Sequence, residues 1–94
     1  MADEFLVIGF LDDLEEGIRY AKINGYSGEF GVRLQAFHDE LVDVSNRIEE
    51  EDAINRMNEM LEDLVEECFI SCREGNQERS EKALARLEDC LKKL

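Results

Sequence analysis

The chain contains no proline among its 94 residues. A proline-free sequence rich in leucine, glutamate and arginine is typical of a mostly helical protein. Long hydrophobic runs are missing as well. The apolar run at residues 5–11 is too short to span a bilayer, and Asp3 and Glu4 precede it, where a signal peptide would carry positive charge. We therefore expect a helical, cytoplasmic protein that does not bind membranes.

Positive charge is scarce. Lysine and arginine together number 11 against 24 aspartates and glutamates, and the formal net charge is -13. Such a charge disfavours direct binding to nucleic acid or anionic membranes, because both repel it at long range, and it favours a basic protein surface as partner. The apolar fraction of 44% is close to that of folded proteins, so we expect one packed domain over residues 1–94.

Cysteine occurs only at Cys68, Cys72 and Cys90, and an odd number does not form a disulfide framework. Together with His38, the three thiols have the ligand types of a tetrahedral zinc site. Two cysteines four residues apart on a helix are a weak zinc signal, however, and cysteine is among the residues most often buried in cores. We interpret the three as core thiols and expect neither a metal nor a cofactor.

Catalytic motifs are missing too. His38 is followed by Asp39 and Glu40, but Gln35 stands three residues before it, so the Glu-x-x-His pair of di-iron proteins is not formed. The sequence has no glycine-rich phosphate loop and no nucleophile elbow. We interpret His38 as a residue at the core boundary and the chain as non-enzymatic.

Apolar residues at helical spacing predict a first helix over residues 3–24, with Asp3 as its N-cap and a stop at Asn24. The alternative for its first part is a strand that ends near Gly9. The opening sequence FLVIGFL is apolar on more than one helix face, which indicates contact with two neighbours or burial in an oligomer interface. A homodimer is therefore expected.

Residues 25–28, GYSG, predict a tight loop, because two glycines supply the backbone freedom that a reversal needs. A second helix is expected to start near Glu29. The aromatic residues around the loop either pack onto the core, which we favour, or form an exposed contact point for a partner. These residues are Tyr20, Tyr26 and Phe30.

The second helix has a regular apolar seam that breaks at Ile48. The seam consists of Leu34, Phe37, Leu41, Val44 and Ile48. The next apolar series begins at Ile54, one residue out of phase with it. We favour a turn at residues 49–52, with Asp52 as N-cap of the next helix, over one helix of more than forty residues.

A third helix is expected over residues 52–72 and a last one over residues 77–94. Between them, Gly75 fits the left-handed position past a helix end and Asn76 fits an N-cap. The last helix balances its own charges through pairs such as Glu78 with Lys82. Together, these elements predict an all-α fold, a small antiparallel bundle of three or four helices.

The third helix is amphipathic, and its polar side carries many more acidic than basic residues. Its expected core stripe is Ile54, Met57, Leu61, Leu64, Val65, Cys68 and Cys72. Its opposite side carries Glu59, Glu62, Asp63, Glu66 and Glu67, several of them four residues apart. Like charges at this spacing repel by a few tenths of a kcal/mol each, roughly. Packing, neighbouring basic residues or a basic partner must offset that repulsion.

This acidic side supports two interpretations. It is either a solvated surface or a docking surface for a basic partner, such as the nucleic-acid channel of another protein. By analogy of composition, small phage-type inhibitors and anti-restriction proteins act as nucleic-acid mimics. The partner-binding residues would be Glu49, Glu50, Glu51, Asp52, Glu59, Glu62, Asp63, Glu66 and Glu67, with a further contribution from Asp12, Asp13, Glu15 and Glu16.

The leading hypothesis is thus a non-enzymatic interaction module that inhibits or regulates a partner through its acidic helix face. The alternative is a self-assembling structural or regulatory subunit whose interface is the apolar surface of the first helix.

Overall fold

Residues 2–93 form four α-helices. The structure is a computed structural model that describes residues 2–93, with side chains from residue 6 onwards. The helices are α1 (Ala2–Asn24), α2 (Gly28–Arg47), α3 (Glu51–Glu74) and α4 (Gln77–Lys92). The predicted all-α bundle is confirmed, with four helices. The strand alternative near Gly9 is wrong, because residues 2–24 form one helix. The side chain of Asp3, the expected N-cap, lies outside the described residues.

The turn between α3 and α4 has the predicted caps. Gly75 has a φ of 75°, and its N–H donates to the carbonyl of Cys72 at 3.1 Å. The next N–H, of Asn76, donates to the carbonyl of Ser71 at 3.0 Å, which completes a Schellman-type end. The Asn76 side chain then accepts from the N–H of Arg79 at 3.1 Å as the N-cap of α4.

The turn between α2 and α3 is also confirmed, and the single long helix is wrong. Residues 48–50 are not helical, and Ile48 has extended backbone angles, φ -84° and ψ 116°. The prediction of Asp52 as N-cap is wrong. Glu50 holds that position without a side-chain hydrogen bond, and Asp52 lies in the first turn of α3. There its carboxylate interacts favourably with the positive end of the helix dipole.

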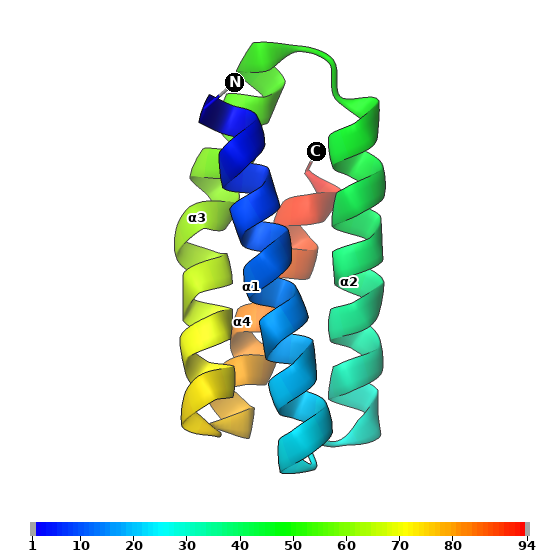
Figure 1. Cartoon of the computed structure of the whole chain (residues 1–94), viewed down its shortest axis with the longest axis vertical. Helices are drawn as coiled ribbons and strands as arrows, with labels where there is room; N and C mark the ends of the chain where they lie inside the picture. The colour runs from blue at the N-terminus through cyan, green and yellow to red at the C-terminus, as the bar shows by residue number, and fades with distance from the viewer. Residues whose placement is uncertain (1, 94) are drawn as a thin grey trace.

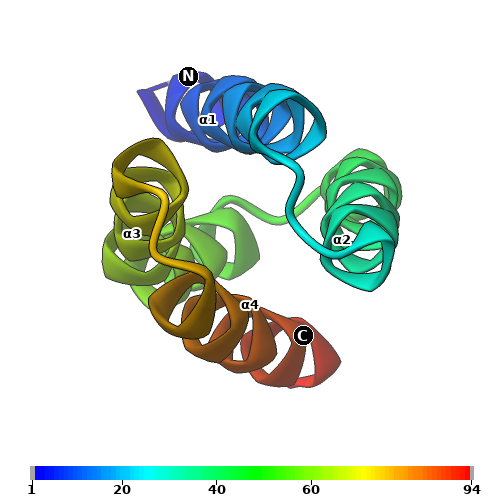
Figure 2. The same ribbon diagram turned by 90° about the horizontal axis from the view of Figure 1, so that it is seen from below.

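The helices pack around one core in a square arrangement (Figure 2). Consecutive helices run antiparallel, but the connection at residues 48–50 crosses the end of the bundle, so that α3 lies beside α1 and diagonally opposite α2 (Figures 1 and 2). As a result, the extensively packed neighbours α1 and α3 run parallel. The α2–α4 contact is the smallest of the four sides.

The core combines the predicted apolar stripes. Of the stripe expected on α3, five members are buried and two, Ile54 and Leu64, are only partly buried. The packed core contains Val7, Phe10, Leu14, Ile18, Phe30, Leu34, Phe37, Leu41, Met57, Leu61, Val65, Leu84 and Leu87, together with smaller side chains. On α1 the apolar surface exceeds what the bundle covers: Leu6 is 45% exposed and Ile8 53%. Within the described range, no helix is both long and apolar enough to cross a membrane.

Candidate functional site

The most unusual surface of the protein lies along the neighbouring helices α1 and α3. Helix α3 presents four exposed carboxylates there, and α1 contributes three more next to them. We call these seven residues the acidic face: Asp12, Asp13 and Glu16 on α1, and Glu59, Glu62, Asp63 and Glu66 on α3. All are exposed except Asp13, which is half-buried.

The pKa of Asp13 reflects the charges that surround it on this face. Burial raises the pKa of the Asp13 carboxyl above its usual 3.8, and the charges of Glu16, Asp12 and Glu66 raise that pKa further. Glu66 belongs to α3, so a charge on one helix affects the pKa of a carboxyl on the other. Within residues 6–93, no lysine or arginine forms an ion pair with any carboxylate of the acidic face. The fold therefore gathers these carboxylates on one side of the bundle without pairing any of them to a described lysine or arginine.

Glu67 behaves differently from its neighbours on α3. It is turned towards α4, where Arg79 binds it through two nitrogens; one of these hydrogen bonds, from Nη2 to Oε2, is 2.8 Å long. Arg79 also pairs with Glu74 at 3.0 Å. The hydrogen bonds from Arg79 hold the pKa of Glu67 below its usual 4.5. Of the five predicted acidic residues on this helix, Glu67 is thus already neutralised from within the chain.

The remaining predicted residues lie at one end of the bundle. Glu49, Glu50, Glu51 and Asp52 are all exposed along the α2–α3 connection and the first turn of α3, and we call them the acidic rim. None of them forms an ion pair with another described residue. At a rise of 1.5 Å per residue, Glu51 and Glu66 are about 22 Å apart along α3. Acidic residues therefore extend over most of the helix.

Glu15 is not part of this surface. Its carboxylate lies 3.6 Å from Nε2 of His38 on α2, on the other flank of α1. The other ring nitrogen of His38 lies 3.4 Å from the carboxylate of Asp39. The side chain of His38 is only 12% exposed, which agrees with its interpretation as a boundary residue.

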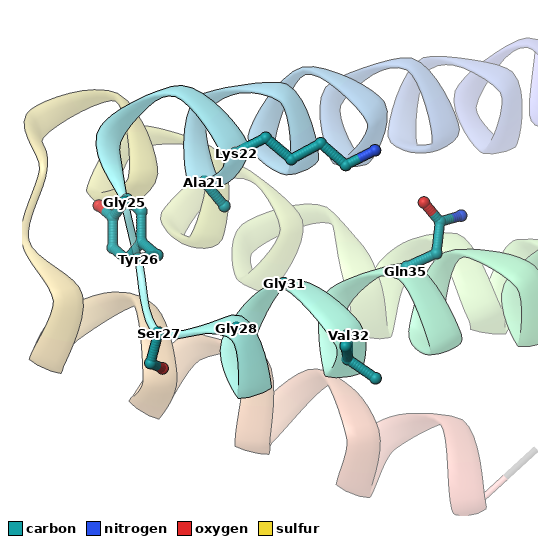
Figure 3. Close-up of a pocket in the computed structure, with 9 residues that line it drawn as sticks. All are labelled: Ala21, Lys22, Gly25, Tyr26, Ser27, Gly28, Gly31, Val32 and Gln35. Atoms are coloured by element: carbon teal, nitrogen blue, oxygen red, sulfur yellow. The ribbon is translucent and has the colours of Figure 1, made fainter.

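The loop between α1 and α2 borders a cavity of about 410 Å³ (Figure 3). Lys22 of α1 and Gln35 of α2 lie on its two sides. Tyr26 is anchored inwards, since its hydroxyl donates to the carbonyl of Cys72 at 3.2 Å. Its ring packs 5.2 Å from that of the buried Phe30. The loop aromatics Tyr26 and Phe30 therefore pack onto the core, as favoured from the sequence.

The cysteines lie in or beside the core. Cys68 and Cys72 are buried, and Cys90 is half-buried. The hydrogen bond to Cys72, together with burial, raises the pKa of the Cys68 thiol well above its usual range, so this thiol is protonated. The described residues contain no cluster of three or more histidine, cysteine or acidic side chains arranged to hold a metal ion.

Comparison of the chain with known protein families, curated proteins and solved structures finds no match.

Sequence reasoning missed Arg79 as the partner of Glu67. A signal for it exists, because Arg79 has no acidic residue three or four positions away on its own helix and is free to reach a neighbouring one. The electrostatic interaction between Asp13 and Glu66 has no comparable signal. It depends on α1 lying beside α3, which no local pattern specifies.

Proposed function

We propose that this protein is a non-enzymatic interaction module that docks its acidic face on a basic surface of a partner protein, which it inhibits or regulates. One observation carries the proposal: exposed carboxylates of α1 and α3 share one side of the bundle, the charge of Glu66 helps to raise the pKa of Asp13, and no described lysine or arginine forms an ion pair with any of them. Like charges held together destabilise the free protein. A basic partner would relieve that repulsion on binding.

The density of charge supports a partner that normally binds nucleic acid. The acidic face together with Glu51 and Asp52 comprises nine carboxylates. The six of them on α3 extend over about 22 Å of helix axis, one charge per about 4 Å, and the three on α1 add to this charge. Duplex DNA carries one charge per about 1.7 Å and each strand one per about 3.4 Å. The α3 carboxylates thus have a charge density close to that of a single strand, to which the α1 carboxylates add, while the net charge of the protein disfavours direct binding to nucleic acid.

Docking of this kind has a recognisable salt dependence. Attraction between complementary charged surfaces accelerates association, and salt weakens it, because the Debye length falls from about 10 Å at 0.1 M to about 3 Å at 1 M. A complex held by the acidic face should therefore form quickly at low salt and weaken steeply as salt is added.

The test is an affinity pull-down from the native cell or host, repeated at low and high salt. A Glu62→Lys/Glu66→Lys variant should lose the partner that the unmodified protein retains at low salt. Glu29→Lys/Glu40→Lys is the matched control, since it reverses two exposed charges on α2, away from the acidic face. Capture that is equally strong at high salt, or that survives the α3 reversal, would show the proposal to be wrong.

A second candidate function is self-assembly through α1. The exposed Leu6 and Ile8, at 45% and 53%, favour it, because they leave apolar surface uncovered in the monomer. We expect a homodimer in this case. Sedimentation equilibrium at micromolar concentration decides the matter, and a monomer there removes the basis of this candidate.

A further inference from the structure

A second cavity, of about 300 Å³, opens at the end of the bundle opposite the loop of Figure 3. It lies between the start of α1 and the end of α2, with the start of α3 as its floor, at the end that the shorter α4 does not reach (Figure 1). Its apolar lining includes Ile8, Leu11, Val42, Ile48, Ile54 and Met57. An engineered apolar cavity of about half this volume, 150 Å³, binds benzene, so two ring-sized groups fit here.

The cavity wall offers an incoming chain few hydrogen bonds. Ser45 is one of its two polar lining residues, and its hydroxyl already donates to the carbonyl of Val42 at 2.8 Å. The other is Asn46, and no charged side chain lines the cavity. A peptide that enters must therefore satisfy its own backbone groups, because buried unpaired N–H and C=O groups are costly. A helix does so, and helices commonly insert apolar side chains into grooves of this kind.

Charge around the opening selects among possible occupants. The chain passes from Ile48 in the cavity wall directly into the acidic rim, whose four carboxylates have no cationic partner in the described part of the chain. An anionic amphiphile would be repelled there. A second copy of this chain, with a net charge of -13, would place its own acidic rim nearby. A helix with lysine or arginine beside its apolar side matches both the cavity and the rim.

We propose that this cavity binds an amphipathic, basic helix of the partner. Apolar side chains of that helix insert between Ile8 and Val42, and its basic residues pair with the acidic rim. The inference rests on the proposed function, because it names the element of the basic partner that the protein recognises. It adds an apolar anchor to what would otherwise be a purely electrostatic contact.

The probe is a fluorescent peptide of about 14 residues that is designed as an amphipathic helix. Leucines recur at steps of three and four residues along one side, and lysines occupy the other side. Fluorescence anisotropy is measured against the unmodified protein, Ile8→Ser and Ile23→Ser. Both isoleucines are exposed on α1, at 53% and 74%, but only Ile8 lines the cavity. Ile8→Ser should weaken binding about fivefold to tenfold, since part of one isoleucine side chain is no longer buried by the peptide. Ile23→Ser should leave binding unchanged.

A Glu49→Gln/Glu50→Gln/Glu51→Gln variant should weaken binding about tenfold and flatten its salt dependence. If this variant loses affinity but Ile8→Ser does not, the cavity is not used, while docking through acidic residues stands. If a leucine–glutamate peptide of the same pattern binds equally well, the basic partner is excluded and the proposed function fails with it. A dimer that Ile8→Ser dissociates would assign the cavity to a second copy and overturn the inference.

Discussion

Gly17 provides the sharpest test of the packing that brings the acidic face together. Gly17 is buried on α1, one helical turn after Asp13, and it faces Leu34 of α2 and Cys72 of α3. A Cβ atom at this position would lie 3.6 Å from Cδ2 of Leu34 and 3.7 Å from Sγ of Cys72. These are ordinary van der Waals distances, so a methyl group fits without displacing either neighbour. Gly17→Ala is therefore expected to stabilise the protein.

Two effects contribute to the magnitude. Alanine is favoured over glycine inside a helix by about 0.5–1 kcal/mol, because the unfolded glycine has more backbone freedom to lose. A fully buried methyl group adds up to about 0.8 kcal/mol. We expect a gain of about 1 kcal/mol in the free energy of unfolding, which corresponds to a rise in Tm of about 4–8 °C for a domain of this size.

Urea denaturation followed by circular dichroism measures the effect. Gly9→Ala is the matched control, because Gly9 is also inside α1 but a Cβ there has no neighbour within 4 Å. It reports helix propensity alone, and the difference between the two variants isolates packing. Gly75→Ala should have the opposite sign, since its φ of 75° costs an L-residue about 1–2 kcal/mol.

The refuting result is a Gly17→Ala variant that loses stability while Gly9→Ala gains it. Overpacking costs about 1–3 kcal/mol. A loss of that size would mean that α1 lies closer to Leu34 and Cys72 than the structure places it, and the spacing of carboxylates across α1 and α3 would have to be revised.

Two further predictions concern pH. The stability due to the lowered pKa of Glu67 is present above its usual 4.5 and is lost as pH falls through the lowered pKa. Arg79→Gln should reduce this acid-induced loss, measured by urea denaturation at a series of pH values. The raised pKa of Asp13 acts in reverse: its contribution is present below 3.8 and is lost as pH rises through the raised pKa. Glu66→Gln should lower the pKa of Asp13 in an NMR titration of the carboxyl carbon; an unchanged pKa would contradict the electrostatic interaction between the two residues.

Much of the local structure was predictable from the chain. The ends at Gly75 and Asn76 depend on backbone angles and hydrogen bonds within a few residues, and the predicted caps are observed. The break at Ile48 follows from a change in apolar phase, which is equally local. The prediction of Asp52 as N-cap failed because the N-cap lies two residues earlier, at Glu50, and the acidic run contains several residues able to begin the helix.

The sequence by itself determined that the chain is helical, which sides of the helices are buried and that acidic residues are in excess, because helical periodicity and capping are properties of short segments. Periodicity specifies which side of a helix is buried but not which helix covers it. Only the tertiary structure decided that α3 packs beside α1. The neighbours of a helix in turn determine which residues interact with the side chains at its flanks. The crossing of the α2–α3 connection places Asp13 within the electrostatic influence of Glu66, and the packing of α4 on α3 lets Arg79 bind Glu67. The acidic face exists because two parallel helices, distant in sequence, share one side of the bundle.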